Sequence, residues 1–125
     1  MRYQAVFWGK VKTGKKRGRK MGFPTVNQNL HKKIPEGIYI SQLSYQEKVY
    51  NALTFIGAAK TFGETRIFAE TYILSFHKEI YGEYATIRLI KKIRENKKFE
   101  SAEKLKLQME EDKRQAEIFF SAVEQ

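Results

Sequence analysis

Cysteine is missing from this 125-residue sequence, which excludes disulfides, thiolate zinc sites and cysteine nucleophiles. Histidine is scarce, and His31 and His77 are too few for a typical catalytic zinc site. Long apolar runs are also missing, because no stretch approaches the roughly 20 consecutive apolar residues that span a bilayer. These absences predict a soluble, cytoplasmic protein and favour a hard, oxygen-bound metal over a soft one.

Interruptions of the chain are few. Pro24 and Pro35 are the two prolines, and the sequence shows no Ser- or Pro-rich linker, low-complexity tract or repeat. The length is near the commonest domain size, and 42% hydrophobic residues, with nine Phe and seven Tyr, can fill one core. We therefore expect a single domain over residues 1–125, with a barrel in about 1–98 and a helix in about 101–124.

Positive charge dominates, since 24 basic residues against 14 acidic ones give a net charge of +10. The partner should therefore be anionic, whether a nucleotide, a nucleic acid or an acidic lipid surface. Charge alone does not choose among these partners. The basic residues concentrate in residues 10–20 and again in residues 91–98.

Short runs rich in Val, Ile, Thr, Phe and Tyr predict consecutive strands up to about residue 93. Residues 38–50 have the pattern of a hairpin with its turn at 45–48. No helical pattern lies between the runs to make parallel crossovers, so a closed or nearly closed antiparallel barrel is favoured over a doubly wound sheet. The expected strands cover about residues 3–11, 22–28, 37–45, 48–58, 66–76 and 83–93.

The hydrophobic period becomes helical after Phe99, with Ser101 as a candidate N-cap and Glu103 in the first turn. We expect one amphipathic helix that packs on the barrel. A partner-binding helix is the alternative, and we disfavour it because the barrel needs a cover. The expected apolar stripe consists of Leu105, Met109, Ala116, Phe119 and Val123.

Residues 14–22 hold three glycines among five basic residues, which suits a flexible loop that approaches phosphate closely. The order of a P-loop is absent. On composition alone, a solvated basic loop, or one that contacts RNA phosphates, is the favoured interpretation. Thr25 and Asn27 follow two residues apart, so on an extended segment they point to one side and can reach one ligand, such as nucleotide-bound Mg²⁺. The alternative is a turn begun by Pro24 with ordinary backbone hydrogen bonds.

Glu70 is a candidate general base. Strand alternation places it on the same face as Phe68, Tyr72, Leu74 and Phe76, which is a poor place for an unpaired carboxylate. Desolvation disfavours the charged form and makes a carboxylate a better proton acceptor for an attacking hydroxyl. A salt bridge to a neighbouring strand explains the position equally well.

The charged link at residues 93–99 offers a third candidate site. Arg94 or Lys97 could hold a product phosphate, and Phe99 could contact an aromatic ring. A polar loop with one anchoring aromatic is the more ordinary interpretation.

Taken in order, these segments resemble the riboflavin kinase family, the flavokinases that occur alone or as the C-terminal half of bifunctional FAD synthetases. The resemblance covers nearly the whole chain, and its most specific element is Gly-Phe-Pro-Thr-x-Asn at 22–27. The other matching positions are 9–14, 17–19, 35–39, 61–63, Gly57, Glu70, Tyr81, Gly82, Arg94, Phe99 and Asp112.

The resemblance implies a six-stranded antiparallel Greek-key barrel flanked by one long helix. It also implies transfer of the γ-phosphate of ATP to riboflavin, giving FMN and ADP, with Mg²⁺ bound by Thr25 and Asn27. Glu70 would be the catalytic base. The implied partners are small molecules, with no nucleic acid or membrane, and the chain is expected to be a monomer. The implied nucleotide-binding residues are Gly14, Lys20, Thr25, Asn27, Ile73, Ser75 and Tyr81, and the implied flavin-binding residues are Arg94, Lys97 and Phe99.

Two residues depart from the family pattern: Phe55 stands where Asn is common, and Lys60 stands where Pro is usual. Neither is the expected base or metal ligand, but Phe55 removes a polar group and could change flavin affinity or rate. Residues resembling the nucleotidyl-transfer half are absent from the sequence, so we expect no FAD-forming activity. The rival predictions are a barrel that keeps flavin or nucleotide binding without turnover, and a basic barrel that binds RNA or single-stranded DNA.

Overall fold

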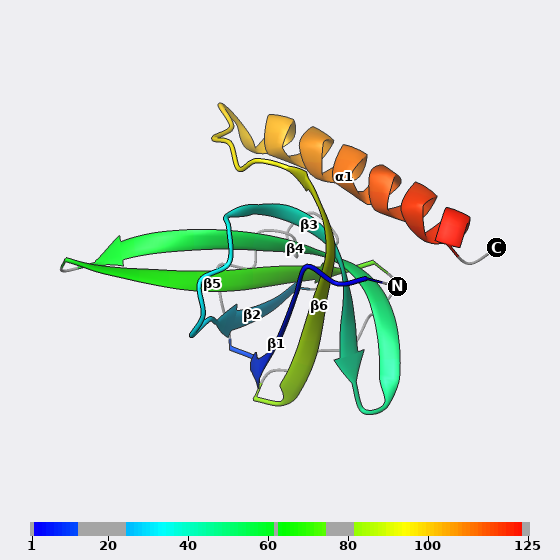
Figure 1. Cartoon of the computed structure of the whole chain (residues 1–125). Coiled ribbons are helices and arrows are strands. Elements are labelled where there is room, and N and C mark those ends of the chain that lie inside the picture. Colours follow the sequence, from blue (N-terminus) through cyan, green and yellow to red (C-terminus); the bar gives the residue numbers. More distant parts are fainter. Residues whose placement is uncertain (1, 13–24, 62, 75–81, 124–125) are drawn as a thin grey trace.

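The computed structural model describes residues 2–12, 25–61, 63–74 and 82–123, except for the side chains of residues 60 and 61. In the described residues, six strands come first and one helix follows them (Figure 1). The elements are β1 (Ala5–Lys10), β2 (Thr25–Asn29), β3 (Gly37–Tyr45), β4 (Lys48–Thr61), β5 (Glu64–Ile73), β6 (Tyr84–Arg94) and α1 (Ala102–Val123).

All six strands belong to one antiparallel sheet in the order β1-β6-β3-β4-β5-β2. The sheet curls into a barrel, and α1 lies across one side of it (Figure 1). β2 and β3 are consecutive in the chain but not neighbours in the sheet, and the same holds for β5 and β6, so the connections are those of a Greek key. The predicted antiparallel barrel with a C-terminal helix is confirmed.

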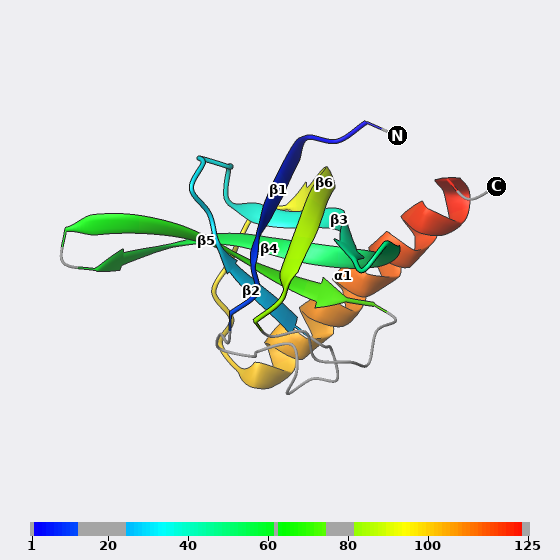
Figure 2. The same ribbon diagram turned by 90° about the horizontal axis from the view of Figure 1, so that it is seen from below.

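The two edge strands of the sheet meet at a seam, where Lys12 N donates to Asn27 O at 2.6 Å. Gln28 of β2 reinforces this seam from inside, because its Nε2 donates to Gly9 O at 2.9 Å and to Ala85 O at 3.1 Å. Gln28 is almost fully buried, and its side chain thereby ties β2 to both β1 and β6. Figure 2 shows β1 and β2 approaching each other across the open side of the sheet.

Two tight turns set the lengths of the central hairpins. Gln46 and Glu47 both have positive φ, 48° and 65°, as the two central residues of the β3–β4 turn. Positive φ at both central residues of a turn matches the twist of the paired antiparallel strands. The hairpin predicted at 38–50 is confirmed. At the end of β4, Gly63 has φ 79°, which is easily reached without a side chain. The β4–β5 ladder therefore runs on to Thr61 and Glu64, further than the predicted strand limits of 58 and 66.

The hydrophobic core has two parts on opposite faces of the curled sheet. One cluster fills the barrel and includes Leu43, Ile56, Ile73, Ile87 and Leu89, all of which are fully buried. The other lies between the barrel and the helix and includes side chains from both. Its buried members are Ile38, Ile40, Leu53, Tyr72, Ile90, Met109, Ala116 and Phe120.

The helix begins where expected, because Lys104 N donates to Ser101 Oγ at 3.2 Å and Ser101 thus caps the first turn. Its buried residues are Met109, Asp112, Ala116 and Phe120. The predicted stripe was wrong at Val123, which is 46% exposed. Val123 lies at the end of α1, which extends past the strands in Figures 1 and 2, so no strand covers it.

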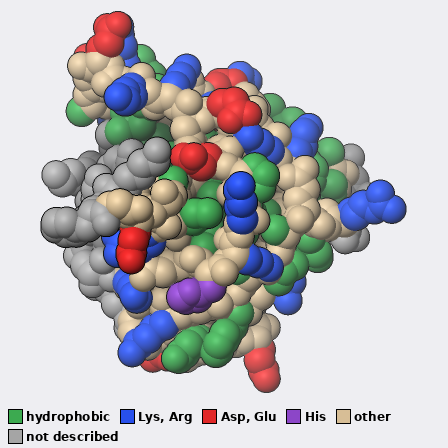
Figure 3. Space-filling view, turned by 60° about the vertical axis from the view of Figure 1, so that its left-hand side comes forward, with side chains coloured by type: hydrophobic (Ala, Val, Ile, Leu, Met, Phe, Trp, Pro, Cys, Tyr) green, Lys and Arg blue, Asp and Glu red, His purple; other side chains and the backbone are tan. Residues whose placement is uncertain are grey.

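One face of the molecule shows how charged side chains of the described residues are distributed. Lys and Arg side chains are spread over the face drawn in Figure 3, with Asp and Glu side chains between them. Residues 13–20, the most basic part of the sequence, lie outside the described residues. Among the described residues, no helix qualifies as a membrane-spanning segment.

Candidate active site

The pairing of β4, β5 and β2 builds two adjacent rows of side chains. Directly opposite residues of antiparallel strands point to the same face, so each row projects from one side of the sheet. Phe55, Glu70 and Asn27 form one row across β4, β5 and β2. Leu53, Tyr72 and Thr25 form the next row, two residues along each strand. We call these six residues the cross-strand rows.

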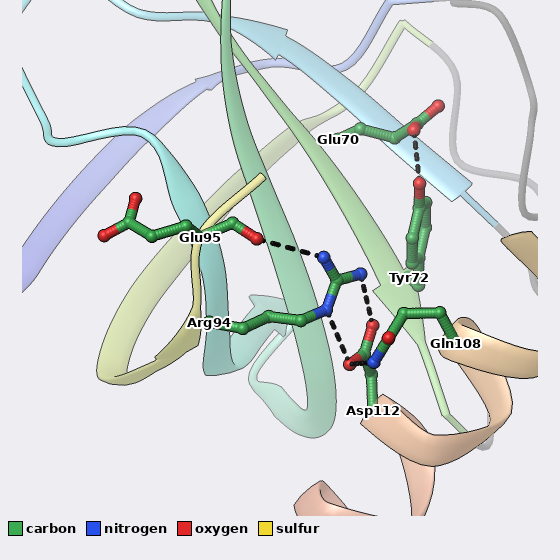
Figure 4. Close-up of polar contacts among 6 residues, drawn as sticks. All are labelled: Glu70, Tyr72, Arg94, Glu95, Gln108 and Asp112. Carbon is green, nitrogen blue, oxygen red and sulfur yellow. Dashed lines mark hydrogen bonds and ion pairs between the residues drawn. The ribbon is translucent and has the colours of Figure 1, made fainter. Parts of the chain in front are cut away.

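Glu70 lies in the middle of its row and is only 1% exposed. The Tyr72 hydroxyl donates a hydrogen bond of 2.5 Å to Glu70 Oε1 (Figure 4). Both residues come from β5 at positions i and i+2, which places them on one face of the strand. The predicted desolvated position of Glu70 is therefore what the structure shows, and a phenol holds one oxygen of the carboxylate.

Thr25 and Asn27 present polar atoms that the described residues leave without a partner. Thr25 Oγ1 and Asn27 Nδ2 are buried and make no hydrogen bond to any described residue. Buried polar atoms of this kind cost free energy, and native proteins tolerate few of them. Asn27 is directly opposite Glu70 and Thr25 is directly opposite Tyr72, so both side chains project from the same face of the sheet as the carboxylate. The arrangement suits a ligand that supplies the missing partners.

The same two residues fit a hard metal ion that arrives with a nucleotide. A hydroxyl and an amide both offer neutral oxygen, and rotation of the Asn27 amide by 180° exchanges its oxygen and nitrogen positions. Mg²⁺ usually takes only one or two protein ligands, with water and phosphate oxygens completing the shell. No group of three or more His, Cys, Asp or Glu suited to a metal occurs among the described residues. Thr25 and Asn27 are therefore the residues that would hold Mg²⁺, which would offset phosphate charge.

A narrow crevice separates the barrel from α1 next to Glu70. Its barrel wall includes Leu53, Phe55 and Tyr72 of the cross-strand rows, together with Ile38. Met109 and Asp112 form its helix wall. The crevice is largely apolar, and its free volume of about 10 Å³ is that of a single water molecule.

Arg94, at the end of β6, is bound to the helix in a fork. Its Nε donates to Asp112 Oδ1 at 2.8 Å, and its Nη2 donates to Asp112 Oδ2 at 2.7 Å (Figure 4). Nη1 donates to Glu95 O at 3.1 Å, and Gln108 Nε2 donates to Asp112 Oδ1 at 3.1 Å. We call Arg94, Asp112 and Gln108 the helix clamp, because it joins the last strand to α1 beside the crevice.

The link after β6 places Phe99 under two cationic groups. The Arg94 guanidinium carbon lies 5.9 Å from the centre of the Phe99 ring, and Lys97 Nζ lies 5.5 Å from it. Asn96 ties this link to β4, because its Nδ2 donates to Ile56 O at 3.1 Å. The structure thus brings together the three residues predicted to bind flavin.

The remaining predicted site residues divide into two groups. Ile73 packs inside the barrel and is 1% exposed, on the face of β5 opposite to Tyr72. The positions that lie outside the described residues are Gly14, Lys20, Ser75 and Tyr81.

Sequence reasoning missed the roles of Tyr72 and Asn96. Strand alternation put Tyr72 on the face of Glu70, but it did not indicate that the two side chains are bonded. The contact of Asn96 with Ile56 joins residues 40 apart in the chain, and no local pattern signals it. Asp112 carries a usable signal, since it is an acidic residue at helical spacing between the buried Met109 and Ala116.

Fold and site together define a small antiparallel barrel in which a buried carboxylate, two polar strand residues and a crevice under a helix converge. Comparison with known protein families identifies the family to which this barrel belongs. The family described as Flavokinase, riboflavin kinase, matches residues 1–120, and the chain belongs to this family.

Curated relatives extend well beyond the region that matches. The bifunctional riboflavin kinase/FMN adenylyltransferase of Bacillus subtilis (strain 168) is 37% identical over 119 residues, which are 90% of this chain and 38% of that protein. The trifunctional protein RibF/MnmA of Mycoplasmoides gallisepticum is 36% identical over 115 residues, 90% of this chain and 18% of that protein. This chain therefore spans less than two fifths of the length of either relative.

A solved structure has the same architecture. The crystal structure of a protein described as a macrolide-efflux protein from Streptococcus pneumoniae matches with a TM-score of 0.80 and 31% identity. The match covers 87% of this chain and 37% of that chain.

Proposed function

We propose that this chain is an ATP-dependent riboflavin kinase that transfers the γ-phosphate of ATP to the terminal ribityl hydroxyl of riboflavin. The observation that carries the proposal is the buried Glu70 directly opposite Asn27, in a chain of the riboflavin kinase family. A base beside two unsatisfied polar atoms is what phosphoryl transfer to an alcohol requires, since a base must meet the hydroxyl close to the bound phosphates.

In this proposal each part of the site has one task. Glu70 orients the ribityl hydroxyl and accepts its proton as the oxygen attacks phosphorus. Thr25 and Asn27 hold Mg²⁺ and the nucleotide phosphates, and the magnesium ion, when bound, offsets the charge on the transferred phosphoryl group. The basic segment through Gly14 and Lys20, together with Ser75 and Tyr81, contacts the nucleotide, and Ile73, whose side chain is buried in the barrel, contributes through its backbone. These assignments follow the family resemblance, and the buried unpaired atoms of Thr25 and Asn27 support them.

The flavin ring is proposed to enter the crevice between the barrel and α1. Its barrel wall carries Phe55 and Tyr72, whose rings can contact a flat aromatic ligand. Phe99, with Lys97 beside it, closes the same side of the molecule. Arg94 acts there through the helix clamp, which fixes the link that carries Phe99.

We further propose that the 125 residues act as one cytoplasmic domain and as a monomer, with riboflavin and ATP as partners. A nucleic-acid partner is not favoured. Binding of a nucleic acid gives no role to a buried carboxylate on the strand opposite Asn27.

The test is a timed incubation of the purified protein with riboflavin, ATP and Mg²⁺, followed by separation and fluorescence detection of FMN. We expect FMN to form only when both ATP and the metal ion are present. A folded protein that binds riboflavin but forms no FMN would instead be a flavin-binding barrel without turnover. Binding of RNA that weakens steeply with salt would point to the nucleic-acid alternative.

A further inference from the structure

Tyr72 belongs to two parts of the site at once. Its hydroxyl donates to Glu70 Oε1 at 2.5 Å, and its ring forms part of the wall of the crevice under α1. The side chain is only 8% exposed, and the hydrophobic cluster between barrel and helix holds its ring in place. A single buried side chain therefore connects the carboxylate to the crevice.

The bond restrains the Glu70 carboxylate. A hydroxyl that donates to a charged oxygen forms a short bond, roughly twice as strong as one between neutral groups. Such a bond holds the carboxylate plane in one orientation. A general base needs this property, because it must face the hydroxyl that it deprotonates.

The neighbouring elements place other groups around this pair. On β2 and β4 the directly facing residues are Asn27 and Phe55, which carry no charge. From α1, Asp112 lines the same crevice as Tyr72, and its charge is matched by Arg94 at 2.7 Å. The charge of Asp112 is therefore balanced by Arg94, while Tyr72 donates directly to Glu70.

We propose that Tyr72 is a positioning residue for phosphoryl transfer, one that holds the Glu70 carboxylate in a fixed orientation. This inference rests on the proposed riboflavin kinase activity and deepens it. Tyr72 itself gives no proton to the product, so the atoms exchanged in the reaction are unchanged: the ribityl proton goes to Glu70, the phosphoryl group goes to the ribityl oxygen, and ADP leaves as its bond to the γ-phosphorus breaks.

The test compares Tyr72→Phe with Tyr39→Phe. Tyr39 is a matched control because it is also buried, and its hydroxyl donates to Pro35 O at 2.6 Å, away from Glu70. Burial raises the pKa of the Tyr39 phenol, so that it stays protonated throughout a neutral pH profile. Both substitutions remove one buried hydroxyl and one hydrogen bond and keep the ring.

In Tyr72→Phe we expect kcat to fall about tenfold, with the riboflavin Kd changed less than about twofold. The loss should appear in kcat and not in riboflavin binding, because the carboxylate is no longer held in one orientation. Tyr39→Phe should leave kcat unchanged, even if its melting temperature falls by a similar amount.

Three results are informative. If Tyr72→Phe keeps the kcat of the wild type, the positioning role is wrong. The same holds if both variants lose kcat equally in proportion to their stability. If the wild type binds riboflavin but forms no FMN, the proposed activity fails first, and the role of Tyr72 fails with it.

Discussion

The cross-strand rows and the helix clamp lie on either side of one crevice, yet they treat polar atoms in opposite ways. In the helix clamp, Arg94 uses three of its N–H groups and Asp112 uses both carboxylate oxygens. In the rows, Thr25 Oγ1 and Asn27 Nδ2 are buried with no partner among the described residues. Satisfied hydrogen bonds fix the helix, whereas unsatisfied buried polar atoms carry a free-energy cost that a ligand can remove. The helix clamp therefore holds the architecture, and the cross-strand rows are the part proposed to bind a ligand.

The substitution with the largest expected effect is Glu70→Gln, in the cross-strand rows. This substitution keeps the size of the side chain and its capacity to accept from Tyr72, but it removes the proton acceptor. We expect turnover to fall by about a hundredfold or more while riboflavin binding survives. Steady-state FMN formation and a fluorescence titration of riboflavin measure the two effects separately, and Glu110→Gln, on the exposed side of α1, is the control. Unchanged turnover in Glu70→Gln would remove this residue from the mechanism.

Asp112→Ala tests the bonded side. Removing one partner of a largely buried pair leaves the Arg94 guanidinium without its counter-charge, which is costly when little water reaches it. Arg94 keeps 18% of its side chain exposed, so we expect a loss of unfolding free energy of about 2 kcal/mol, below the value for a fully buried pair. Urea denaturation measures this loss.

The control for this substitution is Glu111→Ala, which breaks the exposed pair of Glu111 with Arg114 in the same helix. Exposed pairs of this kind contribute little, so the urea midpoint should hardly move. Equal losses in Asp112→Ala and Glu111→Ala would show that the helix clamp does not hold α1 to the barrel.

Thr25→Val tests the unsatisfied atoms of the cross-strand rows, because stability and activity should change in opposite directions. Replacing an unpartnered buried hydroxyl by a methyl group of the same shape removes a desolvation cost, so the melting temperature should stay level or rise. The apparent affinity for Mg–ATP should fall about tenfold, because one hard oxygen is lost. Thermal melts without ligand and FMN formation at varied Mg–ATP measure the two effects. A stability loss without a change in nucleotide affinity would make Thr25 a structural residue.

The architecture was predictable where its cause is local. Alternation of apolar residues gave each strand to within a few residues, and Ser101 marked the start of the helix, because these patterns act within one element. The length of the β4–β5 ladder was underestimated, since the tight turn at Gly63 extends the pairing beyond the apolar runs.

Candidate residues of the site can be selected from the sequence, but the contacts between them cannot. The spacing of Thr25 and Asn27, and the placement of a carboxylate on an apolar face, are visible in the sequence, and the structure puts Asn27 opposite Glu70. The register that creates this contact depends on pairing between strands about 40 residues apart, which no local pattern fixes. The helix clamp likewise needs the final packing angle of α1 before Arg94 can meet Asp112.

The seam between β1 and β2 gives the molecule an uneven resistance to local opening. The other strand pairs of the barrel are joined by ladders of several residue pairs, with register shifts between β3 and β6, whereas here the described chain shows the Lys12–Asn27 bridge and the side-chain bonds of Gln28. Amide hydrogens near a short seam exchange with solvent through small fluctuations, while those of central strands wait for global unfolding. Since Asn27 is part of that seam, slowed exchange along β2 on adding Mg–ATP would report nucleotide binding at this edge even in a variant that cannot turn over.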